Sequence, residues 1–136
     1  MGSYMSAWSD YAPLVLRLAT GVIFALHGLQ KLQGGLAGTT GFVSSLGFPM
    51  PEVFAVLLIA AELGGGILLI LGLLTRLAAK ALVIVSLFAL FLVHLANGFF
   101  MATGGYEYIL LLLAASVSLM ITGGGKWSLD RMLLKA

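Results

Sequence analysis

The chain has 136 residues, of which 61% are hydrophobic and only 9% are charged, whereas soluble domains carry about 25% charged residues. A soluble core of this size cannot cover so much apolar surface, so we expect a lipid-embedded protein. The net charge of +2 includes no dense basic stretch, which argues against a nucleic-acid surface. The absence of cysteine excludes disulfides, thiolate nucleophiles and thiolate metal sites.

Apolar segments occur four times along the chain. Each has roughly the length that a helix needs to cross about 30 Å of hydrocarbon, and none shows strand alternation or the short length of a barrel strand. They run over about 13–29, 53–74, 77–95 and 106–121. The sequence therefore predicts an all-α polytopic membrane protein, a bundle of four transmembrane helices in a single domain spanning 1–136.

The connections between these segments differ in character. The tight turn at Thr75-Arg76 predicts that the second and third helices are antiparallel neighbours. The longer loop between the first and second helices contains a stretch, Thr40 to Leu46, that we expect to form a short re-entrant or interfacial helix. The tail over 127–135 predicts a short interfacial helix capped by Ser128.

Basic residues indicate the orientation of the chain. One side of the predicted bundle carries Arg76, Lys80, Lys126, Arg131 and Lys135, and the other carries Lys31 alone. The positive-inside rule then places both termini in the cytoplasm and the long first loop outside. We expect a multi-pass protein of the plasma membrane, in which Arg17 snorkels toward the headgroups.

Ionisable residues inside the predicted spans gather toward the outer half of the bundle. His27 and Lys31 are four residues apart and share a face of the first helix. Glu62 lies ten residues after Glu52, roughly 15 Å along the second helix and near the middle of the membrane. Such residues are costly in lipid and default to functional sites, so Glu62 is the strongest candidate.

The third and fourth helices contribute to the same polar cluster. His94 and Asn97 are three residues apart at the outer end of the third helix, and Glu107 lies in the first turn of the fourth. One interpretation is structural: Glu62 pairs with a histidine or lysine, or stays protonated, and fixes which faces pack. The other, which we favour, is a pocket for a ligand, a proton or a metal. The Glu-x-x-His spacing of di-iron bundles is missing, so no metal is assigned.

Seven short motifs occur in an order that resembles the DoxX family, over Tyr11 to Asp130. They are Arg17-Leu18-Ala19-Thr20-Gly21, His27-Gly28-Leu29-Gln30-Lys31-Leu32, Gly47-Phe48-Pro49-Met50-Pro51, Glu62-Leu63-Gly64-Gly65-Gly66, Leu71-Gly72-Leu73-Leu74-Thr75-Arg76, Gly104-Gly105-Tyr106-Glu107-Tyr108 and Gly123-Gly124-Gly125-Lys126-Trp127-Ser128-Leu129-Asp130. The resemblance implies a four-helix membrane bundle. It also implies a link to redox systems, because DoxX-like proteins include a subunit of an archaeal thiosulfate:quinone oxidoreductase and companions of thiol-stress enzymes. The polar positions of the family fall here on His27, Lys31, Glu62 and Glu107.

The leading hypothesis is a quinone-linked redox subunit. The quinone headgroup would lie among His27, Glu62, His94 and Asn97. His27 or His94 would form a hydrogen bond with a quinone oxygen, and Glu62 would carry a proton. Lys31 and Glu107 complete the predicted cofactor-binding set, and Glu62 and His27 are the catalytic candidates. If the chain takes part in catalysis, we expect it to do so as a subunit of a membrane quinone-dependent oxidoreductase. The alternatives are a non-enzymatic scaffold or assembly factor for a redox enzyme, and a small-solute or proton pathway that would need a homo-oligomer.

Overall fold

The computed structural model describes residues 2–135, among which there are helices and turns but no strand. The four predicted apolar segments are all helical, with ends within four residues of the prediction. In chain order the elements are α1 (Gly2–Ser9), α2 (Tyr11–Gln33), α3 (Leu36–Ser45), α4 (Pro51–Ile59), η1 (Ala60–Gly64), α5 (Gly65–Leu71), α6 (Thr75–Ala89), η2 (Leu90–His94), η3 (Leu95–Asn97), η4 (Met101–Thr103), α7 (Glu107–Thr122) and α8 (Leu129–Leu133). The segments η1 and η2 are π-helical, and η3 and η4 are 3₁₀ turns.

Within residues 2–135, three helices are long and apolar enough to cross a membrane. They run over Tyr4–Gln33, Pro51–Leu71 and Thr75–Asn97. The fourth apolar helix, α7, has 16 residues, about 24 Å at the usual rise per residue. The structure thus bears out a polytopic helical chain, while the fourth crossing stays a prediction.

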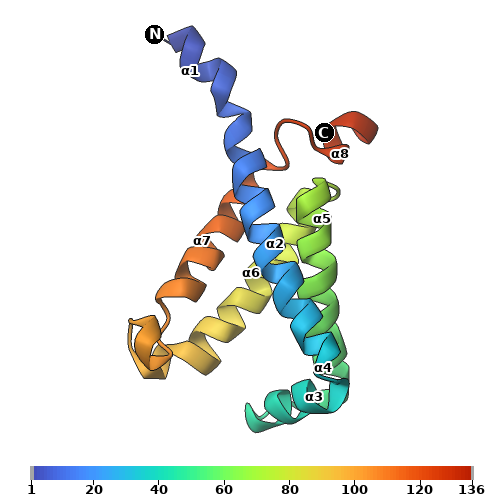
Figure 1. Ribbon diagram of the computed structural model, residues 1–136, viewed down its shortest axis with the longest axis vertical. Coiled ribbons are helices and arrows are strands. Elements are labelled where there is room, and N and C mark those ends of the chain that lie inside the picture. The colour runs from blue at the N-terminus through green and yellow to red at the C-terminus, as the bar shows by residue number, and fades with distance from the viewer. Residues whose placement is uncertain (1, 136) are drawn as a thin grey trace.

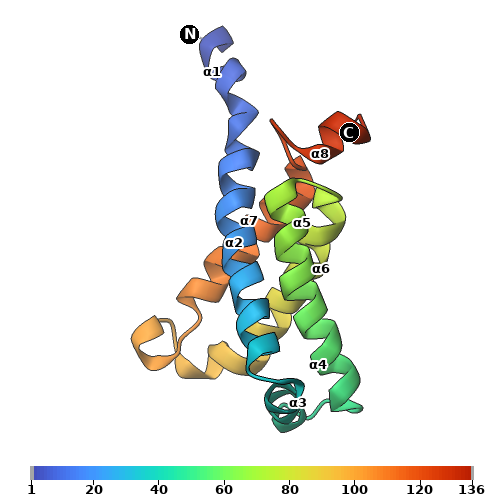
Figure 2. The same ribbon diagram turned by 45° about the vertical axis from the view of Figure 1, so that its right-hand side comes forward.

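The long helices form a bundle that is closed at one end and splayed at the other. Helices α2, α4–α5, α6 and α7 converge near α8, and α6 and α7 lean away from α2 and α4 toward the opposite end (Figure 1). There α3 lies across the ends of α2 and α4 (Figure 2). This α3 (Leu36–Ser45) confirms the short helix expected in the first loop. The N-terminal α1 is a helix that the sequence did not predict.

Glycines allow α2 to approach the second long helix closely. A Cβ added at Gly21 would lie 2.7 Å from the carbonyl oxygen of Gly66, and one at Gly66 would lie 2.7 Å from the carbonyl oxygen of Gly21. A Cβ added at Gly28 would lie even closer to the backbone nitrogen of Leu63. Because apolar surface gains little from burial within lipid, such small-residue contacts are what hold membrane helices together.

Arg17 closes the end of the bundle near α8, and the prediction that it snorkels is wrong. Its side chain is 1% exposed and its guanidinium donates hydrogen bonds to the backbone carbonyls of Leu69, Ile70, Gly124, Lys126 and Trp127. The end of α5 and the glycine-rich tail leave carbonyl groups without helical partners. The five donors of one guanidinium satisfy them.

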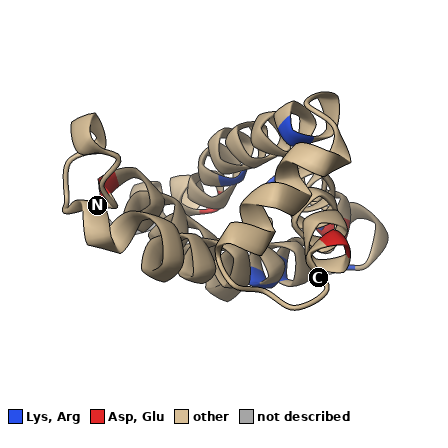
Figure 3. Cartoon of the chain, turned by 90° about the horizontal axis from the view of Figure 1, so that it is seen from below, with Lys and Arg blue, Asp and Glu red and all other residues tan. Residues whose placement is uncertain are grey.

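Asp130 fixes the start of α6 at the same end. Its carboxylate accepts hydrogen bonds from the backbone N–H of Leu74 at 2.6 Å and of Thr75 at 2.9 Å, which are donors that a helix start leaves unpaired. Ser128 caps α8 as predicted, because its hydroxyl accepts from the N–H of Arg131 at 3.3 Å. Charged residues are sparse along the rest of the helices (Figure 3).

Candidate functional site

A cavity of about 900 Å³ lies among α2, α3, α4–η1, α6–η2 and α7. Its walls are largely apolar and rich in phenylalanine, and the ring of Phe48 packs against Phe54 and Phe88 with centroids 5.0 and 5.6 Å away. Four of the six predicted site residues line it: His27, Lys31, Glu62 and His94. The structure therefore brings residues from three separate helices to one apolar chamber.

Lys31 and Glu62 form an ion pair in the wall of this cavity. The Nζ atom of Lys31 lies 2.7 Å from Oε2 of Glu62. The Glu62 residue is 7% exposed, and the side chain of Lys31 is 27% exposed. A buried carboxylate needs such a partner. The pair thus agrees with the structural interpretation of Glu62 and also presents a charged group to whatever occupies the cavity.

His27 lies one helical turn before Lys31 on α2. Its Nδ1 atom is 2.8 Å from the carbonyl oxygen of Ile23, and its ring centroid is 6.4 Å from that of Tyr108 on α7. Tyr108 also lines the cavity. The sequence reasoning did not single it out, although it follows Glu107 directly in one of the motifs that carry the family resemblance.

His94 and Asn97 share a hydrogen-bond acceptor in the loop after α6. Nδ1 of His94 lies 2.9 Å and Nδ2 of Asn97 3.2 Å from the carbonyl oxygen of Gly104. Asn97 also donates to the carbonyl oxygen of Val93 at 3.3 Å. Asn97 lies outside the cavity lining, so its contacts fold the loop that holds His94.

Glu107 performs a similar role at the start of α7. Its Oε1 atom accepts a hydrogen bond from the backbone N–H of Met101 at 2.9 Å, and it too lies outside the cavity lining. The first turn of a helix favours a carboxylate through the helix dipole. These contacts fix the loop over 98–106 beside the cavity.

Two π-helical turns supply polar groups to the cavity. Glu62 lies in η1, which interrupts the α-helical span between α4 and α5, and His94 ends η2, which follows α6 and leads into the 3₁₀ turn η3. A π-turn inserts one extra residue and rotates the side chains that follow, and such turns are frequent at functional sites. The sequence reasoning missed both turns.

No group of three or more histidine, aspartate or glutamate side chains within residues 2–135 lies close enough to hold a metal ion. The polar side-chain groups of the cavity lining are instead the ammonium of Lys31, the carboxylate of Glu62, the imidazoles of His27 and His94, the phenol of Tyr108 and the hydroxyl of Thr39. These groups suit a ligand that is mainly apolar and carries a few hydrogen-bonding oxygens.

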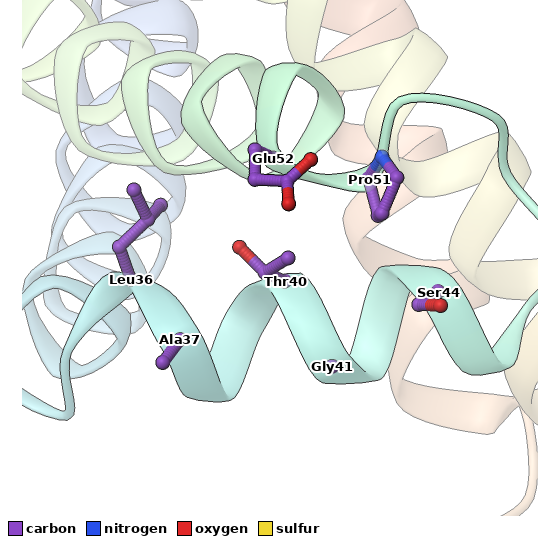
Figure 4. Close-up of a pocket in the computed structure, with 7 residues that line it drawn as sticks. All are labelled: Leu36, Ala37, Thr40, Gly41, Ser44, Pro51 and Glu52. Carbon is purple, nitrogen blue, oxygen red and sulfur yellow. The ribbon is translucent and has the colours of Figure 1, made fainter.

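A second, shallower groove lies on the other face of α3. Thr40 of α3 and Glu52 in the first turn of α4 face each other across it, with Leu36, Ala37, Gly41, Ser44 and Pro51 around them (Figure 4). The hydroxyl of Thr40 is buried and has no hydrogen-bond partner in the described part of the chain. Helix α3 thus separates this smaller groove, in which Thr40 and Glu52 face each other, from the large apolar cavity.

The fold and the cavity define a small polytopic helical membrane protein with a mostly apolar, partly open cavity between its helices. The DoxX family model matches residues 12–95, which is more than half of the chain. The chain belongs to the DoxX family, as its motifs indicated.

Relatives of nearly full length support this assignment. "Putative oxidoreductase CatD" of Bacillus subtilis is 38% identical over 93% of this chain and 90% of its own length. An uncharacterized protein of Haemophilus influenzae is 34% identical over 96% and 97%. "Inner membrane protein YqjF" of Escherichia coli is 31% identical over 96% and 98%. No solved structure matches the chain.

Proposed function

We propose that the cavity binds a lipid-soluble quinone and that the chain is the quinone-linked membrane component of an oxidoreductase system. The observation that carries the proposal is an apolar chamber of about 900 Å³ with the Lys31–Glu62 ion pair in its wall. Pockets of roughly 300–1,000 Å³ with few polar groups are typical of small-molecule sites. A quinone ring and part of its tail fit that description.

The charged pair suits the chemistry of a quinone. The ammonium of Lys31 has three donors, of which one is directed at Glu62, so others are free for a quinone oxygen. Reduction of a quinone takes two electrons and two protons. The pair would supply one proton at a quinone oxygen, water would supply the second, and an associated redox enzyme would supply both electrons. The name of CatD, a putative oxidoreductase, supports a redox setting.

Binding of decylubiquinone to the purified protein in lipid nanodiscs tests this proposal. We expect saturable binding that Glu62→Gln weakens at least tenfold, because the variant removes the charge that holds Lys31 in the wall. Glu52→Gln is the matched control, since Glu52 lies earlier on the same helical span but outside the cavity. Its affinity should equal that of the wild type.

Two results would overturn the proposal. One is that the wild-type protein binds neither decylubiquinone nor its reduced form, decylubiquinol, saturably. The other is an equal effect of Glu62→Gln and Glu52→Gln. Either would leave the scaffold or assembly-factor hypothesis, in which a partner protein co-purifies and substitution of Glu62 has no functional effect.

A further inference from the structure

The two histidines of the cavity are both held through the same ring nitrogen. Nδ1 of His27 lies 2.8 Å from the carbonyl oxygen of Ile23, and Nδ1 of His94 lies 2.9 Å from that of Gly104. A backbone carbonyl can only accept a hydrogen bond. In both rings, therefore, Nδ1 carries a proton and donates it to the backbone.

The bond at Nδ1 determines what the opposite nitrogen can do. In a neutral imidazole with a proton on Nδ1, the Nε2 atom is an acceptor with a free lone pair. Neither Nε2 atom has a hydrogen-bond partner within residues 2–135, and both rings line the cavity. The chamber therefore offers two imidazole acceptors in addition to the carboxylate of Glu62.

We propose that this site prefers the reduced form of its ligand, an aromatic diol, over the quinone; the inference rests on the proposed function. The hydroxyl groups of a quinol donate hydrogen bonds, which His27 and His94 accept at Nε2. The oxygens of a quinone only accept, so they would meet lone pairs at both histidines and would depend on the donors of Lys31, Tyr108 and Thr39. The cavity is partly open, and a polar group left without a partner in apolar surroundings, whether protein or lipid, is costly.

This preference changes the histidine role that the sequence suggested. A histidine that donates to a quinone oxygen through Nε2 must be a doubly protonated imidazolium. With a neutral ring, the histidines recognise the quinol instead. Tighter binding of the quinol also makes the bound quinone easier to reduce, and each tenfold preference raises the two-electron midpoint potential by about 30 mV.

Three ligands test the inference under anaerobic conditions in nanodiscs at pH 8: decylubiquinol, decylubiquinone and the dimethyl ether of decylubiquinol. We expect the quinol to bind at least tenfold more tightly than the quinone. The dimethyl ether has the same ring and tail but no hydroxyl donors, so it should lose this preference. An ether that binds as tightly as the quinol, or a quinone that binds at least as tightly, would overturn the inference.

Substitution of the histidines assigns the preference to particular groups. His27→Phe and His94→Phe should each lower the quinol-to-quinone affinity ratio at least threefold, while His94→Gln should retain part of it, because the glutamine side-chain carbonyl is also an acceptor. An unchanged ratio in both phenylalanine variants would contradict the inference. If a variant does not fold, the three-ligand series on the wild-type protein decides alone.

The two proposals fail in different ways. Binding of neither the quinone nor the quinol would refute the proposed function, and the redox preference with it. Saturable binding of both forms with equal affinity would refute only the preference and leave the quinone site intact.

Discussion

Lys31 and Glu62 lie 31 residues apart in sequence and make the contact on which the candidate site depends. The four-residue spacing of His27 and Lys31 predicts their shared helix face, and the depth of Glu62 follows from counting residues along the second span. The choice of partner could not be predicted, because a histidine or a lysine could equally have met the carboxylate. It depends on how α2 packs against η1, which in turn depends on backbone contacts.

Removal of one partner of this pair should be far more costly than removal of both. Lys31→Met leaves a carboxylate buried without a partner, and we expect a loss of about 3 kcal/mol in the free energy of unfolding. The double variant Lys31→Met, Glu62→Leu should recover most of that loss, because both charges are gone. Unfolding by sodium dodecyl sulfate, followed by circular dichroism, measures both.

Lys80→Met provides the control for this comparison. Lys80 is exposed at the opposite end of the molecule, so its substitution should change the free energy of unfolding by less than about 0.5 kcal/mol. The pair contributes little to stability if Lys31→Met costs no more than Lys80→Met.

At the scale of elements, the sequence predicts the apolar helices well and their irregularities poorly. Helix existence follows from long apolar runs. The second span, predicted to run to about 74, ends at Leu71, because Gly72 adopts the left-handed region with φ +65° and stops the helix there. The π-turns η1 and η2 could not be predicted, since each displaces the helical register by a single residue within five. The contacts of Arg17 were missed because they join segments more than 50 residues apart.

The packing of α2 on α5 makes a prediction that separates two neighbouring glycines. Gly66→Ala places a methyl group against the backbone of α2, so we expect a loss of about 1–3 kcal/mol in the free energy of unfolding and weaker quinone binding. At Gly64 an added Cβ meets no atom within 4 Å, so Gly64→Ala should be neutral or slightly stabilising. Equal destabilisation by the two substitutions would show that close helix approach is not what Gly66 provides.

At the scale of the whole molecule, both ends of the described chain lie at the same end of the bundle (Figure 1). This arrangement suits an even number of membrane crossings, with the 16-residue α7 as the fourth. The apolar composition is sufficient to predict that the chain is a membrane protein. It does not predict how a short apolar helix such as α7 meets a bilayer, because tilt and local thinning accommodate the mismatch.

Single cysteines test the number of crossings, since the natural sequence contains none. Met5→Cys, Ser44→Cys and Lys135→Cys place a thiol in α1, in α3 and at the end of the tail. With four crossings, a membrane-impermeant maleimide should label positions 5 and 135 from one side and position 44 from the other. Labelling of positions 5 and 135 from opposite sides would indicate three crossings.

The central claim is that the chamber between α2, α3, η1, η2 and α7 is a quinone site, and photoaffinity labelling tests it most directly. An azidoquinone would be cross-linked to the protein in nanodiscs, and the modified residues located by peptide mass spectrometry. We expect labels on buried residues of the cavity lining, such as Phe24 and Val43, and excess decylubiquinone should prevent them. Labels confined to outward-facing residues such as Ile67 and Phe91, unaffected by competitor, would contradict it.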